Sequence, residues 1–116
     1  MQLINSERRK AHCADVRMHG RLRNAARTHS ADMAAGDFTA GKGSDGSSPQ
    51  DRAGAAGYGD FAAEVLAKGG DAGDVVKHWL RDDDRDVLLD CSVRSIGVGA
   101  AKRGRTLFWT VDTGRA

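Results

Sequence analysis

The chain has 116 residues, enough for one hydrophobic core but too few for two, so we expect a single domain spanning residues 1–116. Its 18 basic and 16 acidic residues nearly balance, and the basic residues of the first third are not interleaved with aromatic ones. This pattern argues against a nucleic-acid partner. No apolar run reaches the length of a bilayer crossing, so we expect no membrane span.

Two helices are predicted at the start of the chain, over residues 2–12 and 20–34. In the first, apolar residues face inward and the charged run is expected in solvent. The inward residues are Leu3, Ile4 and Ala11, and the charged run is Glu7, Arg8, Arg9 and Lys10. In the second, four residues recur at spacings of four, three and four, which places them on one buried face. They are Leu22, Ala26, His29 and Met33.

Residues 36–47 are rich in Gly, Ser and Asp and predict a loop. A short helix is expected to follow, because Ser48 can cap it, Pro49 suits its first position and Asp51 completes a capping box. Gly57-Tyr58-Gly59 should end that helix.

The second half of the chain predicts strands and one further helix. Residues 61–66 indicate a short strand, and a helix is expected from Asp71 or Asp74 with Val75, Val76, Trp79 and Leu80 inward. Residues 87–89 predict a brief apolar turn. Apolar residues then alternate with others in two further strands, joined by a hairpin loop at 102–105; they are Ile96, Val98 and Ala100 in the first strand and Leu107, Trp109 and Val111 in the second. Helices beside a small antiparallel sheet predict a three-layer α/β/α sandwich.

Three motifs that would indicate a functional site were considered, and the sequence supports none of them. Residues 41–46 match G-x-G-x-x-G, but no buried strand precedes them and no long helix follows directly, so we interpret them as a loop. Residues 81–86 lack the spacing and central Gly of a calcium loop and are expected to be a solvated charge run. None of the serines lies in a G-x-S-x-G nucleophile elbow.

The two cysteines, Cys13 and Cys91, are compatible with buried free thiols or with one bridge. Neither belongs to a C-x-x-C pair and no histidine pair accompanies them, which excludes an ordinary structural zinc site.

Two stretches of the sequence resemble the CAP superfamily, which comprises cysteine-rich secretory proteins, antigen 5 and plant pathogenesis-related proteins. They are His29-Ser30-Ala31-Asp32-Met33-Ala34 and Asp45-Gly46-Ser47-Ser48-Pro49-Gln50-Asp51-Arg52. The resemblance extends over nearly the whole chain and implies an α/β/α fold. It also implies a Cys13–Cys91 bridge, and a bridge implies secretion of a bacterial protein whose leader is absent from this chain.

The resemblance also locates a cavity. Family members that bind a metal bring two histidines and one or two acidic residues together, at the positions matched here by Gly41, Glu64 and Asp84. Only Glu64 keeps the family's residue, so we expect a degenerate cavity with no metal and no other cofactor. We expect His29, bonded to backbone, and the inward Trp79 to be structural, and we expect no catalytic residue.

The leading interpretation is a secreted or cell-surface bacterial domain that binds an unknown protein, cell-wall or lipid ligand without catalysis. One alternative is a carrier for a lipid or another small apolar ligand, as the resemblance suggests. The other is a weak hydrolase that uses Glu64 and Asp84.

Overall fold

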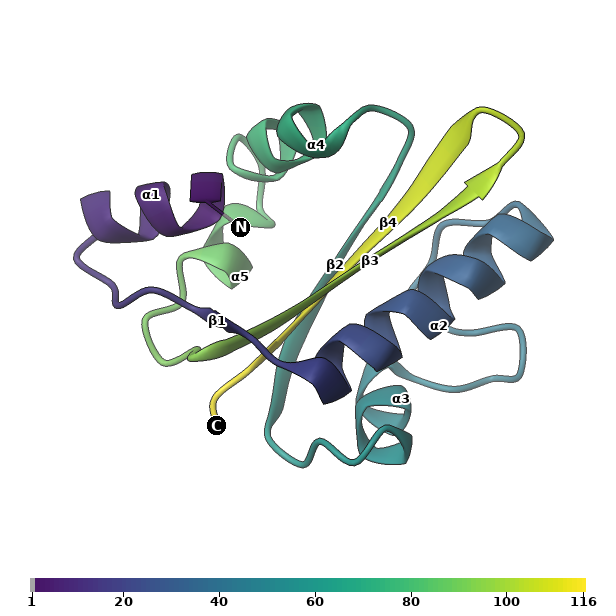
Figure 1. Cartoon of the computed structure of the whole chain (residues 1–116), viewed down its shortest axis with the longest axis horizontal. Helices are drawn as coiled ribbons and strands as arrows, with labels where there is room; N and C mark the ends of the chain where they lie inside the picture. The colour runs from purple at the N-terminus through teal and green to yellow at the C-terminus, as the bar shows by residue number, and fades with distance from the viewer. Residues whose placement is uncertain (1) are drawn as a thin grey trace.

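The computed structural model describes residues 2–116. Its elements in chain order are α1 (Gln2–Lys10), β1 (Arg17–Met18), α2 (Gly20–Gly36), α3 (Pro49–Ala55), β2 (Phe61–Lys68), α4 (Ala72–Trp79), α5 (Arg85–Leu88), β3 (Ser95–Arg103) and β4 (Thr106–Gly114). The sheet lies between a layer of α2 and α3 and a layer of α1, α4 and α5 (Figure 1). The predicted α/β/α sandwich is confirmed. Among the helices of residues 2–116, none combines the length and apolar character that a bilayer crossing requires.

The sheet has the strand order β1-β3-β4-β2. β4 pairs antiparallel with β3 through the predicted hairpin and also antiparallel with β2, whereas β1 pairs parallel with β3. β1 was not predicted, because two residues are too few to show an alternating pattern. The β3–β4 hairpin is tighter than the predicted loop at 102–105, since Arg103 already pairs with Thr106. Its turn begins at Gly104 with φ 61°, a conformation that favours glycine.

Helix α2 packs unusually close to the sheet because β3 alternates glycine with larger residues. All four residues of the predicted inward face, Leu22, Ala26, His29 and Met33, are fully buried. A Cβ added to Gly97 would lie 2.2 Å from the carbonyl carbon of Leu22, and one added to Gly99 would lie 2.4 Å from that of Ala26. Only glycine therefore allows the helix backbone to sit at this distance from the strand.

We expect Gly99→Ala to lower the free energy of unfolding by about 3 kcal/mol, at the upper end of the range for overpacked cores. The added methyl group meets backbone atoms of α2 and cannot be accommodated by a side-chain rotation. Urea denaturation of the variant and of the wild type would measure the difference. Gly54→Ala, in α3 with nothing within 4 Å of the added Cβ, is the control and should be at least as stable as the wild type. A Gly99→Ala variant as stable as Gly54→Ala would contradict the close packing.

The other helix layer covers the main apolar cluster. Val75, Val76 and Trp79 of α4 are buried there with Leu88 of α5. The Trp79 indole Nε1 donates a hydrogen bond of 2.9 Å to the carbonyl oxygen of Leu66, so this aromatic side chain also fixes α4 against β2. Asp71, rather than Asp74, caps α4. The first two residues of the apolar turn predicted at 87–89 end the short helix α5, and Leu89 is its C-cap.

Three predictions for the first helix were wrong. α1 ends at Lys10 instead of continuing to residue 12, and Ala11 is exposed. Arg8, expected in solvent, is fully buried. Its guanidinium donates four hydrogen bonds of 2.8–3.0 Å to backbone carbonyl oxygens, those of Ala14, Leu88, Asp90 and Val93. Burial lowers the pKa of Arg8, while the carboxylates of Asp90 and Asp15 oppose that shift.

The Cys13–Cys91 disulfide is present, as the family resemblance implied. It joins the segment after α1 to the segment before β3 across a sequence separation of 78 residues. A bridge that closes a loop of this length stabilises the folded chain by about 4–5 kcal/mol in the chain-entropy treatment. The disulfide and the Arg8 hydrogen bonds therefore tie the same two parts of the chain together.

Candidate functional site

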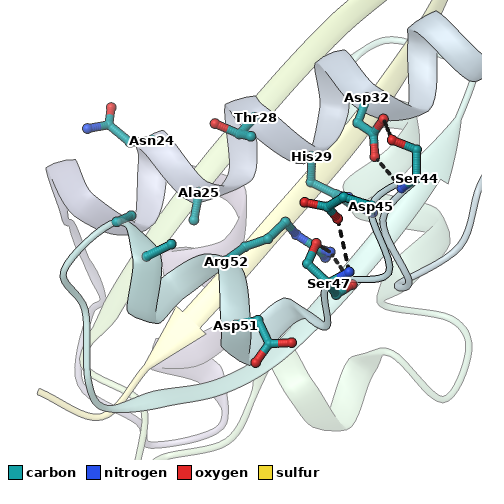
Figure 2. Close-up of a pocket in the computed structure, with 12 residues that line it drawn as sticks. Asn24, Ala25, Thr28, His29, Asp32, Ser44, Asp45, Ser47, Asp51 and Arg52 are labelled. Atoms are coloured by element: carbon teal, nitrogen blue, oxygen red, sulfur yellow. Dashed lines mark hydrogen bonds between the residues drawn. The ribbon is translucent and has the colours of Figure 1, made fainter.

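A groove of about 680 Å³ lies between α2, α3 and the loop that connects them (Figure 2). Its lining residues are Asn24, Ala25, Thr28, His29, Asp32, Ser44, Asp45, Ser47, Asp51, Arg52, Ala55 and Ala56. Two local features hold its walls. The backbone N–H and the hydroxyl of Ser44 both donate to the Asp32 carboxylate, at 2.8 and 2.6 Å, which fastens the loop to α2. The predicted capping box of Ser48 and Asp51, with Pro49 at the first turn, starts α3.

Beneath the groove, Arg52 of α3 forms a buried ion pair with Glu64 of β2. The Arg52 Nη2 donates to both carboxylate oxygens of Glu64, at 3.2 and 3.1 Å, and the two side chains are only 8% and 4% exposed. The Arg52 Nη1 also donates to the carbonyl oxygen of Ser47, 3.0 Å away. Arg52 therefore joins α3, the loop and β2. The sequence pattern assigned this residue only to a helix start.

His29 of α2 lies next to this pair. Its Nε2 donates a hydrogen bond of 2.7 Å to the carbonyl oxygen of Ala40 and is 4.0 Å from the Glu64 Oε1. In the neutral imidazole with its proton on Nε2, Nδ1 is an acceptor, and Nδ1 has no hydrogen-bond partner among residues 2–116. The histidine is thus buried and bonded to backbone, the arrangement that its place on the apolar helix face predicted.

A second acidic residue, Asp112 of β4, accompanies Glu64 and was missed by the sequence analysis. The two are directly opposite each other on paired strands, and Asp112 is fully buried. Within residues 2–116 neither of its carboxylate oxygens has a hydrogen-bond partner. Burial and, after it, the neighbouring Glu64 raise the pKa of Asp112 to about 9. Asp112 is therefore protonated at neutral pH, while Arg52 balances the charge of Glu64.

One signal in the sequence could have revealed Asp112. Leu107, Trp109 and Val111 alternate on one face of the predicted strand, so the even-numbered residues must face the other helix layer. An acidic side chain at 112 is then directed toward α2 instead of solvent.

The structure brings together two of the three expected cavity positions. A Cβ on Gly41 would lie 3.8 Å from the Glu64 Oε1, so these residues are neighbours. Asp84 immediately precedes α5, in the other helix layer. Its pKa is raised by burial and then by Asp82 and Asp83, and Glu64 is not among the groups that act on it.

The residues present at this site do not suit a metal ion. Across residues 2–116, no three side chains of His, Cys, Asp or Glu converge as metal ligands would. Both oxygens of Glu64 are engaged by Arg52, and Gly41 contributes no side-chain ligand. The site is therefore a buried cluster below an open groove, and the charge of its Glu64 is balanced by Arg52.

Comparisons with known proteins agree on the fold. The model of the CAP, or cysteine-rich secretory protein, family matches residues 1–113. An outer surface protein from Borrelia burgdorferi superimposes with a TM-score of 0.88 at 19% identity, covering 98% of this chain and 87% of that one. An extracellular protein containing an SCP domain from Bacillus anthracis gives 0.83 at 21% identity, and a cysteine-rich secretory protein from Staphylococcus aureus gives 0.71 at 11%. They cover 100% and 99% of this chain, which spans only 40% and 36% of theirs. No curated protein matches the sequence.

Proposed function

Because this chain belongs to the cysteine-rich secretory protein family, we propose that it is a secreted or cell-surface bacterial domain that binds a ligand in its α2–α3 groove without catalysis. The Cys13–Cys91 disulfide supports an oxidising location, since such bridges persist outside the cytosol. The names of two structural neighbours, an outer surface protein and an extracellular protein, support the same location. A groove of about 680 Å³ is large enough for a small organic ligand.

The observation that carries this proposal is the buried Arg52–Glu64 pair, in which the Arg52 Nη2 donates to both carboxylate oxygens. A metal ion at Glu64 would have to displace the guanidinium, and breaking a buried pair costs about 3–5 kcal/mol. Gly41 offers no ligand to compensate for that loss. The pair therefore favours a structural role for Glu64 over a role as a metal ligand.

The same cluster gives no support to acid–base chemistry in the groove. Glu64 is paired with Arg52, and neither Glu64 nor the protonated Asp112 is among the residues that line the groove. Asp84, the partner considered for a hydrolase, lies in the other helix layer. The carboxylates that do line the groove, Asp32, Asp45 and Asp51, each accept hydrogen bonds from a serine that hold their pKa values below the ordinary range, which suits binding better than proton transfer.

Equilibrium dialysis against zinc followed by metal analysis tests the proposal. We expect far less than one zinc ion per chain, and a family member that retains both cavity histidines provides the positive control. Hydrolysis of ester and peptide substrates should be the same for the wild type and for Glu64→Gln. Stoichiometric tight zinc, or a hydrolytic activity lost in Glu64→Gln, would contradict the proposal.

A further inference from the structure

The rim of the groove carries an excess of negative charge. Three carboxylates line it, and hydrogen bonds from serines hold their pKa values below the ordinary range: Ser44 for Asp32, Ser47 for Asp45 and Ser48 for Asp51. Arg52 is the one arginine or lysine of the lining, and Glu64 neutralises it. The rim is therefore strongly negative on a chain whose formal net charge is +2. Figure 2 shows the side chains of Asp32 on α2 and of Asp45 on the connecting loop.

An independent feature of the lining also favours a hydrogen-bond donor. His29 is fully buried, and its Nδ1 is an acceptor without a partner among residues 2–116. A buried acceptor left unpaired costs about 1–3 kcal/mol, and an N–H group of a ligand would remove that cost. One donor of the lining, the Arg52 Nε, is also buried without a hydrogen-bond partner among residues 2–116.

The remaining lining sets the shape of the ligand. Ala25 of α2 and Ala55 and Ala56 at the end of α3 present methyl groups beside the polar side chains. An apolar wall of this kind suits methylene groups, which gain from burial about 0.8 kcal/mol each. The groove can therefore accommodate a ligand that has a polar end and an apolar stem.

We propose that the groove binds an organic ammonium or guanidinium group on a short aliphatic stem, as carried by a lysine or arginine side chain or by a free alkyl amine. This inference rests on the proposed function, because it specifies the ligand class of the same groove. The cation contacts the Asp32 and Asp45 carboxylates and donates to His29 Nδ1. Its stem lies against the alanines.

Chemical-shift titration of the folded protein tests this with three five-carbon probes: pentylammonium, pentanoate and pentanol. We expect pentylammonium alone to shift the backbone amides of residues 24–32 and 43–52 in a saturable way that weakens as salt is raised. A capped Gly-Lys-Gly peptide forms a fourth arm. Tighter binding of the peptide than of pentylammonium identifies a protein-borne cation, and the reverse identifies a free amine.

Charge-removing variants provide the matched test. Asp32→Asn and Asp45→Asn keep an acceptor for the serine partner and should each weaken pentylammonium binding about threefold or more. Asp71→Asn removes the charge of a helix-capping carboxylate outside the groove lining and should leave binding unchanged. Unchanged binding in both groove variants would overturn the inference. Binding of pentanol or pentanoate in place of pentylammonium would also overturn it, yet would leave the groove as a binding site.

Discussion

Replacing Arg8 with methionine should lower the free energy of unfolding by more than about 4 kcal/mol, which few single substitutions reach. Methionine fills most of the volume of arginine, so the change removes donors without opening a large cavity. Four carbonyl oxygens, those of Ala14, Leu88, Asp90 and Val93, lose a hydrogen bond from a buried cation. Each such loss costs about 1–3 kcal/mol. Urea denaturation with the disulfide intact would measure the effect.

Two further variants separate the hydrogen bonds of Arg8 from its charge. Arg9→Met changes the neighbouring arginine, whose side chain is 66% exposed and pairs with Asp15 on the surface, and it should unfold much like the wild type. Arg8→Lys keeps a positive charge but has only three donors in a different geometry, so we expect a stability between those of the wild type and Arg8→Met. Equal stability of Arg8→Met and Arg9→Met would show that the buried guanidinium is dispensable.

The second large effect is expected in the pH dependence of stability, through Asp112. Its pKa rises from the ordinary 3.8 to about 9 in the folded chain. Between these values the folded state holds a proton that the unfolded state releases, so stability falls as pH rises, by up to about 1.4 kcal/mol per pH unit. Asp112→Asn cannot titrate and stays neutral at every pH, as the protonated carboxyl is at neutral pH. The variant should therefore lose this slope and exceed the wild type in stability at pH 8.

Urea denaturation at intervals between pH 5 and pH 9 isolates this contribution. The carboxylates with lowered pKa values, including Asp32, Asp45, Asp51 and Asp90, add stability as pH rises through the acidic range and are ionised in both states above about pH 5. The histidines are common to both proteins and cancel in the difference. Parallel stability curves for the wild type and Asp112→Asn would refute a proton on Asp112.

Features encoded by a local pattern could be predicted from the sequence. The buried face of α2 follows from apolar spacing alone, and the start of α3 follows from a capping box within four residues. Arg8 could not be predicted, because it stands in a charged run typical of a surface helix. Two of its carbonyl partners, those of Leu88 and Val93, are 80 and 85 residues away in the sequence. β1 could not be predicted either, because only its pairing with β3 defines it as a strand.

The candidate site also contains some residues that the sequence could identify and others that it could not. Gly41 and Glu64 were identified through the family resemblance, and the structure places them side by side. Asp112 and the ion pair of Arg52 depend on which strands pair and on how α3 lies across β2, and local sequence specifies neither. An acidic residue in a strand is usually solvated, so its burial becomes evident only when Glu64 is seen opposite it.

The close seating of α2 on Gly97 and Gly99 has a consequence for the diversity of such domains. The helix position is fixed by contacts on its sheet side, whereas Asn24, Thr28 and Asp32 follow one another at four-residue intervals along its groove side. Asn24 and Thr28 can be exchanged without altering the backbone that presents them, whereas Asp32 also fastens the loop to α2 through Ser44. A library varied at Asn24 and Thr28, with both glycines and Asp32 retained, would accordingly sample new ligand preferences on an unchanged frame.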